Sequence, residues 1–228
     1  MKTISITAII STVVLTALPL TAISHQQGDL IVRAGAATVD PNNDSSLIYA
    51  AGAGLAGTGV GLNSDTQVGI TVSYMLTNNW GIELLAATPF EHDVAAQGLG
   101  GFGVSTLGTV EHLPPTLSLQ YYFTVAAKNF HPYVGAGINY TLILDESLSS
   151  EAKTGLGATS MDIDDSVGLA LQAGFDYELD KNWMINVSVW KVSIETEAKI
   201  VTSNAFNPIT VDLDIDPWVY MIGAAYKF

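Results

Sequence analysis

Histidines and carboxylates are the side chains of this 228-residue sequence that could move protons or bind metal ions. His92, His112 and His131 lie near the ends of segments with alternating polarity. None of the three has a serine and a carboxylate at a spacing typical of a hydrolytic triad. Cysteine is absent, which excludes disulfides, a thiol nucleophile and a thiolate metal site. We therefore expect no catalytic residue and no cofactor.

Two acidic stretches, MDIDDS at 161–166 and DLDIDP at 212–217, place carboxylates at alternate positions. Such carboxylates could hold Ca²⁺, or share divalent cations with the phosphates of lipopolysaccharide. Neither stretch has the glycine-turned ligand loop of a dedicated Ca²⁺ site. We therefore expect no metal site here and interpret both stretches as a solvated acidic outer rim.

The composition favours a membrane protein without spanning helices. Hydrophobic residues make up 48% of the chain and charged residues 13%, about half the usual share for soluble proteins. No interior stretch offers the ~20 apolar residues that a spanning helix needs, which leaves the closed β-barrel. The net charge of −14 argues against a nucleic-acid partner, because phosphates require Lys and Arg.

The first residues are typical of a secretory signal peptide. They combine a positive start, a short apolar core and the small residues Ala22 and Ser24 before a cleavage site. An uncleaved anchor helix is the alternative, but Pro19 interrupts the apolar core. The expected division is a signal peptide at 1–24 and one mature domain at 25–228.

Eight segments of the mature chain alternate between apolar and polar side chains. They lie near 29–39, 65–76, 80–91, 110–123, 131–144, 163–179, 182–198 and 211–228. Short links alternate with longer ones rich in Gly, Ser, Asn and Asp, near 40–64, 92–109, 145–162 and 199–210. We predict an all-β fold, an eight-stranded antiparallel transmembrane β-barrel with long extracellular loops, short periplasmic turns and both termini in the periplasm. Because the segments exceed the ~9–11 residues that cross a membrane, the wall should extend beyond the outer surface.

The alternation also assigns the two faces of the wall. In 65–76 and 163–179 one face is aliphatic and aromatic, and the other is small or polar. A soluble lipocalin-like barrel would bury the apolar face, but a narrow eight-stranded barrel must keep small side chains inside. Aromatic residues gather near the short links, as in an interfacial girdle. They are Tyr74, Trp80, Tyr121, Phe123, Phe130, Tyr177, Trp183, Tyr226 and Phe228.

Face parity predicts a lumen with two parts. The lower part is polar and is expected to form a plug of paired charges, made by Arg33, Glu83, Gln120, Asp176 and Asn186. The upper part is apolar and is expected to line a channel or form a hydrophobic gate, made by Leu85, Trp190, Val192, Ile194, Val219 and Met221. A β-bulge near Trp190 that reverses the face is the alternative.

Prolines interrupt the upper wall at Pro89, Pro114 and Pro115. Each removes a backbone donor, so neighbouring strands cannot pair fully there. The prolines either simply end strands or mark a lateral opening from the lumen to the bilayer.

Several stretches of the mature chain, in register over nearly its whole length, resemble the OmpW family of small outer-membrane β-barrel proteins of Gram-negative bacteria. They are GDLIVRAGAATVDP (28–41), GIELLAATPF (81–90), HLPPTLSLQYYF (112–123), HPYVGAGINY (131–140), NVSVW (186–190) and DPWVYMIGAAYKF (216–228). The resemblance implies an integral outer-membrane barrel with a narrow, largely hydrophobic channel for small apolar molecules. The loops at 42–64 and 93–108 match no pattern, so no receptor role is carried over.

The expected function is an outer-membrane channel for small hydrophobic molecules, closed at its base and releasing them sideways into the bilayer. The expected partners are those solutes, outer-membrane lipid and lipopolysaccharide, and the assembly machinery, which would recognise the terminal Phe228. One alternative is a polar-plugged structural or adhesin-type barrel whose loops bind partners. An outer-membrane lipid-modifying enzyme is the more distant alternative.

Overall fold

The computed structural model describes residues 25–42 and 44–228 of the chain. The predicted signal peptide at 1–24 and its cleavage site lie outside this part, so that assignment stays a prediction. Within the described ranges, no helix is both long enough and apolar enough to cross a membrane.

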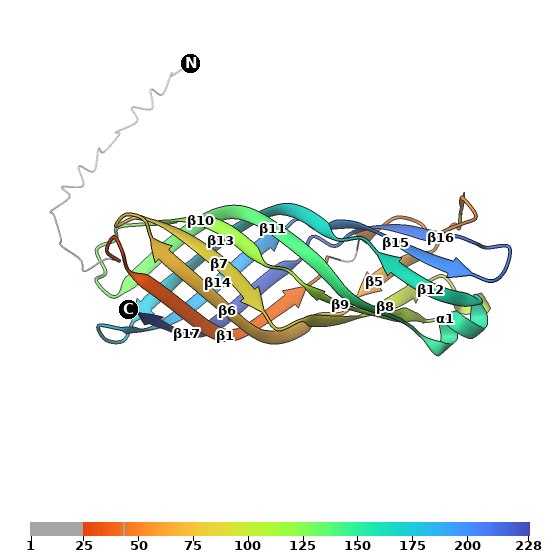
Figure 1. Ribbon diagram of the computed structural model, residues 1–228, viewed down its shortest axis with the longest axis horizontal. Coiled ribbons are helices and arrows are strands. Elements are labelled where there is room, and N and C mark those ends of the chain that lie inside the picture. The colour runs from red at the N-terminus through yellow and green to blue at the C-terminus, as the bar shows by residue number, and fades with distance from the viewer. Residues whose placement is uncertain (1–24, 43) are drawn as a thin grey trace, which may run out of the picture.

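Eight long strands form a closed antiparallel barrel (Figure 1). They are β1 (Leu30–Asp40), β6 (Asp65–Met75), β7 (Trp80–Ala87), β10 (Thr116–Tyr122), β11 (Phe130–Leu148), β13 (Ser166–Glu178), β14 (Trp183–Val192) and β17 (Trp218–Lys227). The strand order is β10-β7-β6-β1-β17-β14-β13-β11, and pairing of β10 with β11 closes the ring. This confirms the predicted fold. Closure gives every barrel strand a partner on both sides.

The two faces of the wall follow the predicted alternation. Val167, Leu169 and Leu171 on β13 are 61% to 71% exposed, whereas Ala170 and Gln172 are buried. Register is continuous along β14 to both neighbours, so no bulge reverses the face at Trp190. At the end with the short turns, exposed aromatic rings pack edge to face across neighbouring strands, as Trp183 does with Tyr226. The apolar side of the wall therefore points outward over the barrel.

The segments predicted as long loops mostly form strands of an extension beyond the barrel. One sheet joins the upper part of β11 to β9 (Thr106–Leu113), β8 (Phe90–Gln97) and β5 (Gly59–Leu62). The other contains β12 (Ala158–Ile163), β15 (Glu195–Thr202), β16 (Ile209–Asp214), β2 (Asp44–Ser45), β3 (Tyr49–Ala50) and β4 (Ala53–Gly54). The helices η1 (Gly100–Phe102) and α1 (Ser150–Gly155) lie in the connections, and Figure 1 places α1 at the far end. The loop prediction is corrected here, because local composition does not reveal such long-range pairing.

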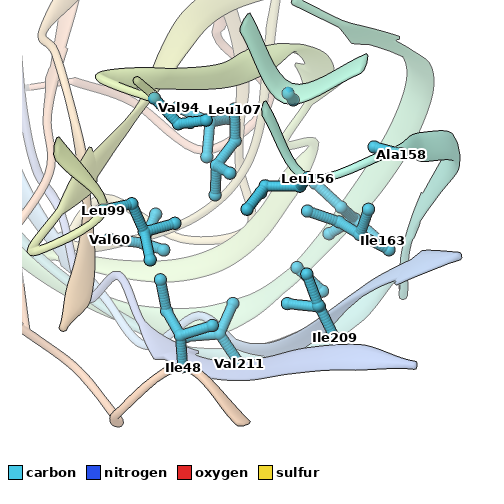
Figure 2. Close-up of a cluster of buried hydrophobic side chains, with 14 of the residues drawn as sticks. Ile48, Val60, Val94, Leu99, Leu107, Leu156, Ala158, Ile163, Ile209 and Val211 are labelled. Carbon is cyan, nitrogen blue, oxygen red and sulfur yellow. The ribbon is translucent and has the colours of Figure 1, made fainter. Parts of the chain in front are cut away.

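Apolar side chains from both sheets fill the extension (Figure 2). We call this cluster the upper core. Val60, Val94 and Leu107 from one sheet face Ile209 and Val211 from the other. The extension is therefore packed like the interior of a β-sandwich.

Small residues on the inner face allow large side chains to fill the narrow barrel. A Cβ at Gly174 would lie 2.7 Å from two atoms at the tip of the Tyr133 ring, which is itself buried. The ring cannot move freely, because its hydroxyl accepts a hydrogen bond from the Asn186 amide. Glycine at this position thus makes room for the aromatic ring.

We expect Gly174→Ala to lower the free energy of unfolding by about 1–3 kcal/mol, because it overpacks the barrel against Tyr133. Urea unfolding in detergent micelles, followed by tryptophan fluorescence, measures the change. Gly100→Ala is the matched control, since its Cβ would meet open space, and it should stay within about 0.5 kcal/mol of the parent. Equal losses in both variants would contradict this packing argument.

Candidate functional site: a plugged lumen beneath two apolar cavities

A buried arginine is the centre of the lower lumen. The Nε of Arg33 donates to Oδ1 of Asp176 at 2.9 Å, and Nη2 donates to Oδ2 at 2.6 Å. Nη2 also donates to the Tyr122 hydroxyl, while Nη1 donates to Ser73 Oγ and to Glu83 Oε2. A guanidinium has five N–H donors, and all of them are therefore used. Burial of this charge is sustained only by such complete pairing.

The other predicted lower-lumen residues belong to the same network, which we call the polar plug. Gln120 accepts from the Tyr122 hydroxyl, and the Asn186 amide donates to Asp176 Oδ1 at 2.8 Å. Sequence reasoning missed Tyr122 and Tyr133, although counting alternate residues from Gln120 and from His131 indicates that both tyrosines point inward. Arg33 pairs with both carboxylates of the predicted plug, with Glu83 through one oxygen and with Asp176 through two.

Two histidines lie below the plug, toward the short turns. The Nε2 of His25 is 3.4 Å from Oδ2 of Asp176, and its ring lies against Tyr122 and His131. His131 Nε2 is 3.2 Å from Glu178 Oε1, which also pairs with Lys227. Neither histidine was predicted to take part in the plug. Together these groups close the short-turn end of the lumen with packed rings and the ion pair between Lys227 and Glu178.

Above the plug lies an apolar layer that crosses the lumen. It contains all six residues predicted for the upper lumen, namely Leu85, Trp190, Val192, Ile194, Val219 and Met221, together with Ala37, Val39, Phe90 and Ala170. Phe90 was missed because it follows Pro89, where the alternation of the strand restarts. The structure thus brings the predicted residues together, while their role as a gate stays a prediction.

Two small cavities lie between this layer and the upper core. The upper cavity, about 30 Å³, is lined largely by aliphatic side chains such as Val94 and Ile163. The wall cavity, about 20 Å³, is lined by residues that include Leu85 and Pro114. They share four lining residues, which are Val39, His112, Ile194 and Pro217. Each volume suffices for only one or two water molecules, so a larger molecule must displace side chains.

The wall itself is interrupted beside the wall cavity. Pairing of β7 with β10 ends at Leu85 opposite Thr116, and pairing of β8 with β9 begins at Phe90 opposite His112. Between these pairs the facing residues form no ladder, and they include all three predicted prolines, Pro89, Pro114 and Pro115. We call this interruption the wall gap. The wall cavity is lined both by inward-facing Leu85 and by the neighbouring Ala86, so it borders the wall at this point.

A pair of histidines lies at the junction of the barrel and the extension. His92 Nε2 and His112 Nε2 are 3.0 Å apart, and the two ring planes are tilted by 16°. His92 Nδ1 lies 2.5 Å from the backbone oxygen of Asn63, and the His112 ring stacks on Phe90. In the described chain, no hydroxyl or carboxylate is hydrogen-bonded to either ring. The pair therefore lacks the neighbours that a histidine base in a catalytic triad requires.

Burial lowers the pKa of both histidines. It lowers the pKa of His92, against a smaller opposite effect of the Asn63 carbonyl and of Asp65 and Asp93. Burial and the neighbouring His92 lower the pKa of His112 to about 3.

The acidic stretches do not lie at the outer rim, which corrects that expectation. Asp164 and Asp165 connect β12 to β13, and Asp216 lies between β16 and β17, at the junction of extension and barrel. Asp165 accepts from the backbone N–H of Ile143, and Asp216 accepts from that of Ile194. These carboxylates therefore satisfy backbone donors where strands stop. Across the described residues, no group of three or more His, Asp or Glu side chains could hold a metal ion.

Comparison with known proteins finds relatives that match most of this chain. Outer membrane protein W of Vibrio cholerae is 45% identical over 207 residues, which cover 90% of this chain and 91% of that protein. The crystal structure of outer membrane protein OprG from Pseudomonas aeruginosa superposes with a TM-score of 0.85 at 47% identity, covering 90% of this chain and 98% of that one. A more distant relative is named dibenzothiophene metabolism operon protein PahQ of Pseudomonas aeruginosa, 25% identical over 68% of each chain.

The model of the OmpW family matches residues 26–228, which is nearly the whole of the described chain. With its closed barrel and its outer-membrane relatives, this chain is a member of the OmpW family and an integral outer-membrane protein.

Proposed function

We propose that the chain is an outer-membrane channel that takes small apolar molecules into the two cavities and releases them sideways into the bilayer through the wall gap. The observation that carries the proposal is the break in strand pairing between Leu85 and Phe90, at the place where the wall cavity borders the barrel wall.

Energetics favour the sideways route over passage along the axis. An apolar solute that leaves water for the apolar layer gains about 25 cal/mol per Å² of buried surface. To continue downward it would have to separate Arg33 from Asp176 and Glu83. An unpaired buried charge costs several kcal/mol, and an apolar solute offers no hydrogen bond in return. The wall gap requires no ladder hydrogen bond to be broken.

The route from outside into the cavities passes the upper core. This core consists of packed aliphatic side chains rather than paired charges, so a solute can exchange one apolar contact for another as it enters. The name of the relative PahQ refers to dibenzothiophene, a flat apolar molecule, and this supports an apolar substrate for the present chain.

The proposal includes an orientation and partners. The short-turn end, with the aromatic girdle and the C-terminus, would lie at the periplasmic face, and the extension would stand outside the cell. Outer-membrane lipid and lipopolysaccharide would cover the exposed aliphatic wall. The terminal Phe228, which is 69% exposed, would be the residue that the assembly machinery recognises.

A structural barrel without transport is the second candidate, and the polar plug favours it. A lumen crossed by a fully paired guanidinium is rigid and closed along its axis. This candidate does not account for cavities lined by aliphatic side chains or for the unpaired wall beside them. It predicts that charges introduced into the apolar layer leave uptake unchanged.

We expect Leu85→Glu to reduce uptake of a small apolar dye at least tenfold, because an unpaired carboxylate in the apolar layer repels apolar solutes and is costly to bury. Uptake is measured in cells that carry equal amounts of folded barrel, as judged by heat-modifiable migration on gels. Leu85→Met preserves volume and polarity, and it should stay within about twofold of the parent.

Glu83→Gln changes the polar plug and leaves the apolar layer intact. Dye uptake by this variant should therefore also stay close to that of the parent. If uptake instead fell with Glu83→Gln and ignored Leu85→Glu, the solute would travel along the axis and the sideways route would be wrong.

We expect the triple replacement of Pro89, Pro114 and Pro115 by alanine to reduce uptake severalfold, because three restored N–H donors allow strand pairing to extend across the wall gap. Hydrogen exchange reports whether the new amides at 114 and 115 become protected. Pro41→Ala, at the end of β1 and away from the gap, is the control. If these amides became protected while uptake stayed unchanged, the result would contradict the lateral route.

A further inference from the structure

The hydrogen bonds of the histidine pair determine which nitrogen carries each proton. The Asn63 carbonyl can only accept, so His92 Nδ1 donates to it. In neutral His92 the other nitrogen, Nε2, then has no proton and accepts. His112 Nε2 therefore donates across the 3.0 Å contact. Neutral His112 has a single N–H, so its Nδ1 is an acceptor.

That acceptor is buried and unpaired. His112 is only 7% exposed, and its Nδ1 has no hydrogen-bond partner. The other polar side chains of the cavity walls differ in this respect. Thr141 Oγ1 donates to Asn139 Oδ1, and the Asn139 amide donates to Thr116 Oγ1. Among the described residues that line either cavity, His112 alone has a buried polar side-chain atom left without a partner.

His112 also lies on the proposed path of the solute. It lines both cavities, and it is the residue of β9 at which pairing with β8 resumes above the wall gap. A solute that moves from the upper cavity to the gap therefore passes this ring. An unpaired buried acceptor is costly, and a solute that donates one hydrogen bond removes this cost.

We propose that His112 Nδ1 is a recognition point for a neutral O–H or N–H donor, so that the cavities select apolar molecules that carry one such group, above all alcohols and phenols, over plain hydrocarbons. This inference rests on the proposed function and names the substrate class for it. The low pKa of His112 supports it, because a neutral ring keeps the acceptor at any pH near neutrality.

The test uses two probes of nearly equal shape, 2-naphthol and 2-methylnaphthalene, which differ by a hydroxyl in place of a methyl group. Binding of each to the full mature chain in lipid nanodiscs is measured by fluorescence. The ratio of the two dissociation constants is compared between variants, which cancels the partitioning of both probes into lipid.

The test variant is His92→Phe combined with His112→Phe, which removes both imidazoles and keeps the stacking on Phe90. The preference for 2-naphthol should fall about three- to tenfold, the usual worth of one hydrogen bond. The matched control is His92→Phe alone, which leaves His112 in place with an acceptor nitrogen, and it should retain the preference.

The outcomes separate this inference from the proposed function. Both probes could bind while the double variant leaves the ratio of their dissociation constants unchanged. In that case the proposed role of His112 is wrong, and the channel proposal is unaffected. If neither probe binds the parent protein, the channel proposal fails as well.

Nitrogen NMR of the unmodified chain gives a reading that does not depend on folding of the variants. His112 Nδ1 should resonate as an unprotonated nitrogen and shift on addition of 2-naphthol but not of 2-methylnaphthalene. A protonated Nδ1 would overturn the inference.

Discussion

One buried guanidinium, that of Arg33, organises the lumen of this barrel. A charge in a space that narrow is stable only if every donor is paired, and side chains from four other strands converge to pair it: Ser73 on β6, Glu83 on β7, Tyr122 on β10 and Asp176 on β13. The bidentate contact with Asp176 joins residues that are 143 positions apart in the chain. The network therefore ties strands on different sides of the ring together and closes the axis near the short turns.

Closing the axis leaves the wall as the remaining route out of the lumen. Seven of the eight wall strands begin or end at the junction with the extension, and β11 is the described strand that continues through it. At two of these positions an aspartate side chain accepts the hydrogen bond of a backbone N–H, as Asp165 does for Ile143 and Asp216 for Ile194. At Pro89, Pro114 and Pro115 the backbone has no donor to be satisfied. The wall can thus remain unpaired there without burying unsatisfied N–H groups.

The extension changes the chemistry of the upper lumen. Because its two sheets pack on each other, the long connections bury aliphatic residues and present few charges to the interior. The cavities lie between this upper core and the apolar layer, and His112 lines both of them. Apolar surroundings make the single unpaired nitrogen of His112 significant, since a buried acceptor is costly to leave unpaired.

Much of this architecture could be predicted from the sequence, because it depends on local periodicity. A two-residue period decides which side chains face lipid. The inward orientation of Leu85, Trp190 and Asp176 could therefore be predicted from the sequence alone. The number of strands, the short turns and the girdle follow from the same pattern.

Only the tertiary structure decided which inward residues meet, since that depends on how strands stagger around a closed ring. Asp176 rather than Glu83 binds Arg33 with both oxygens, and His25 joins them from outside any strand. The strands of the extension and the proton positions of His92 and His112 likewise arise from contacts between distant segments, and no local pattern in the chain encodes those contacts.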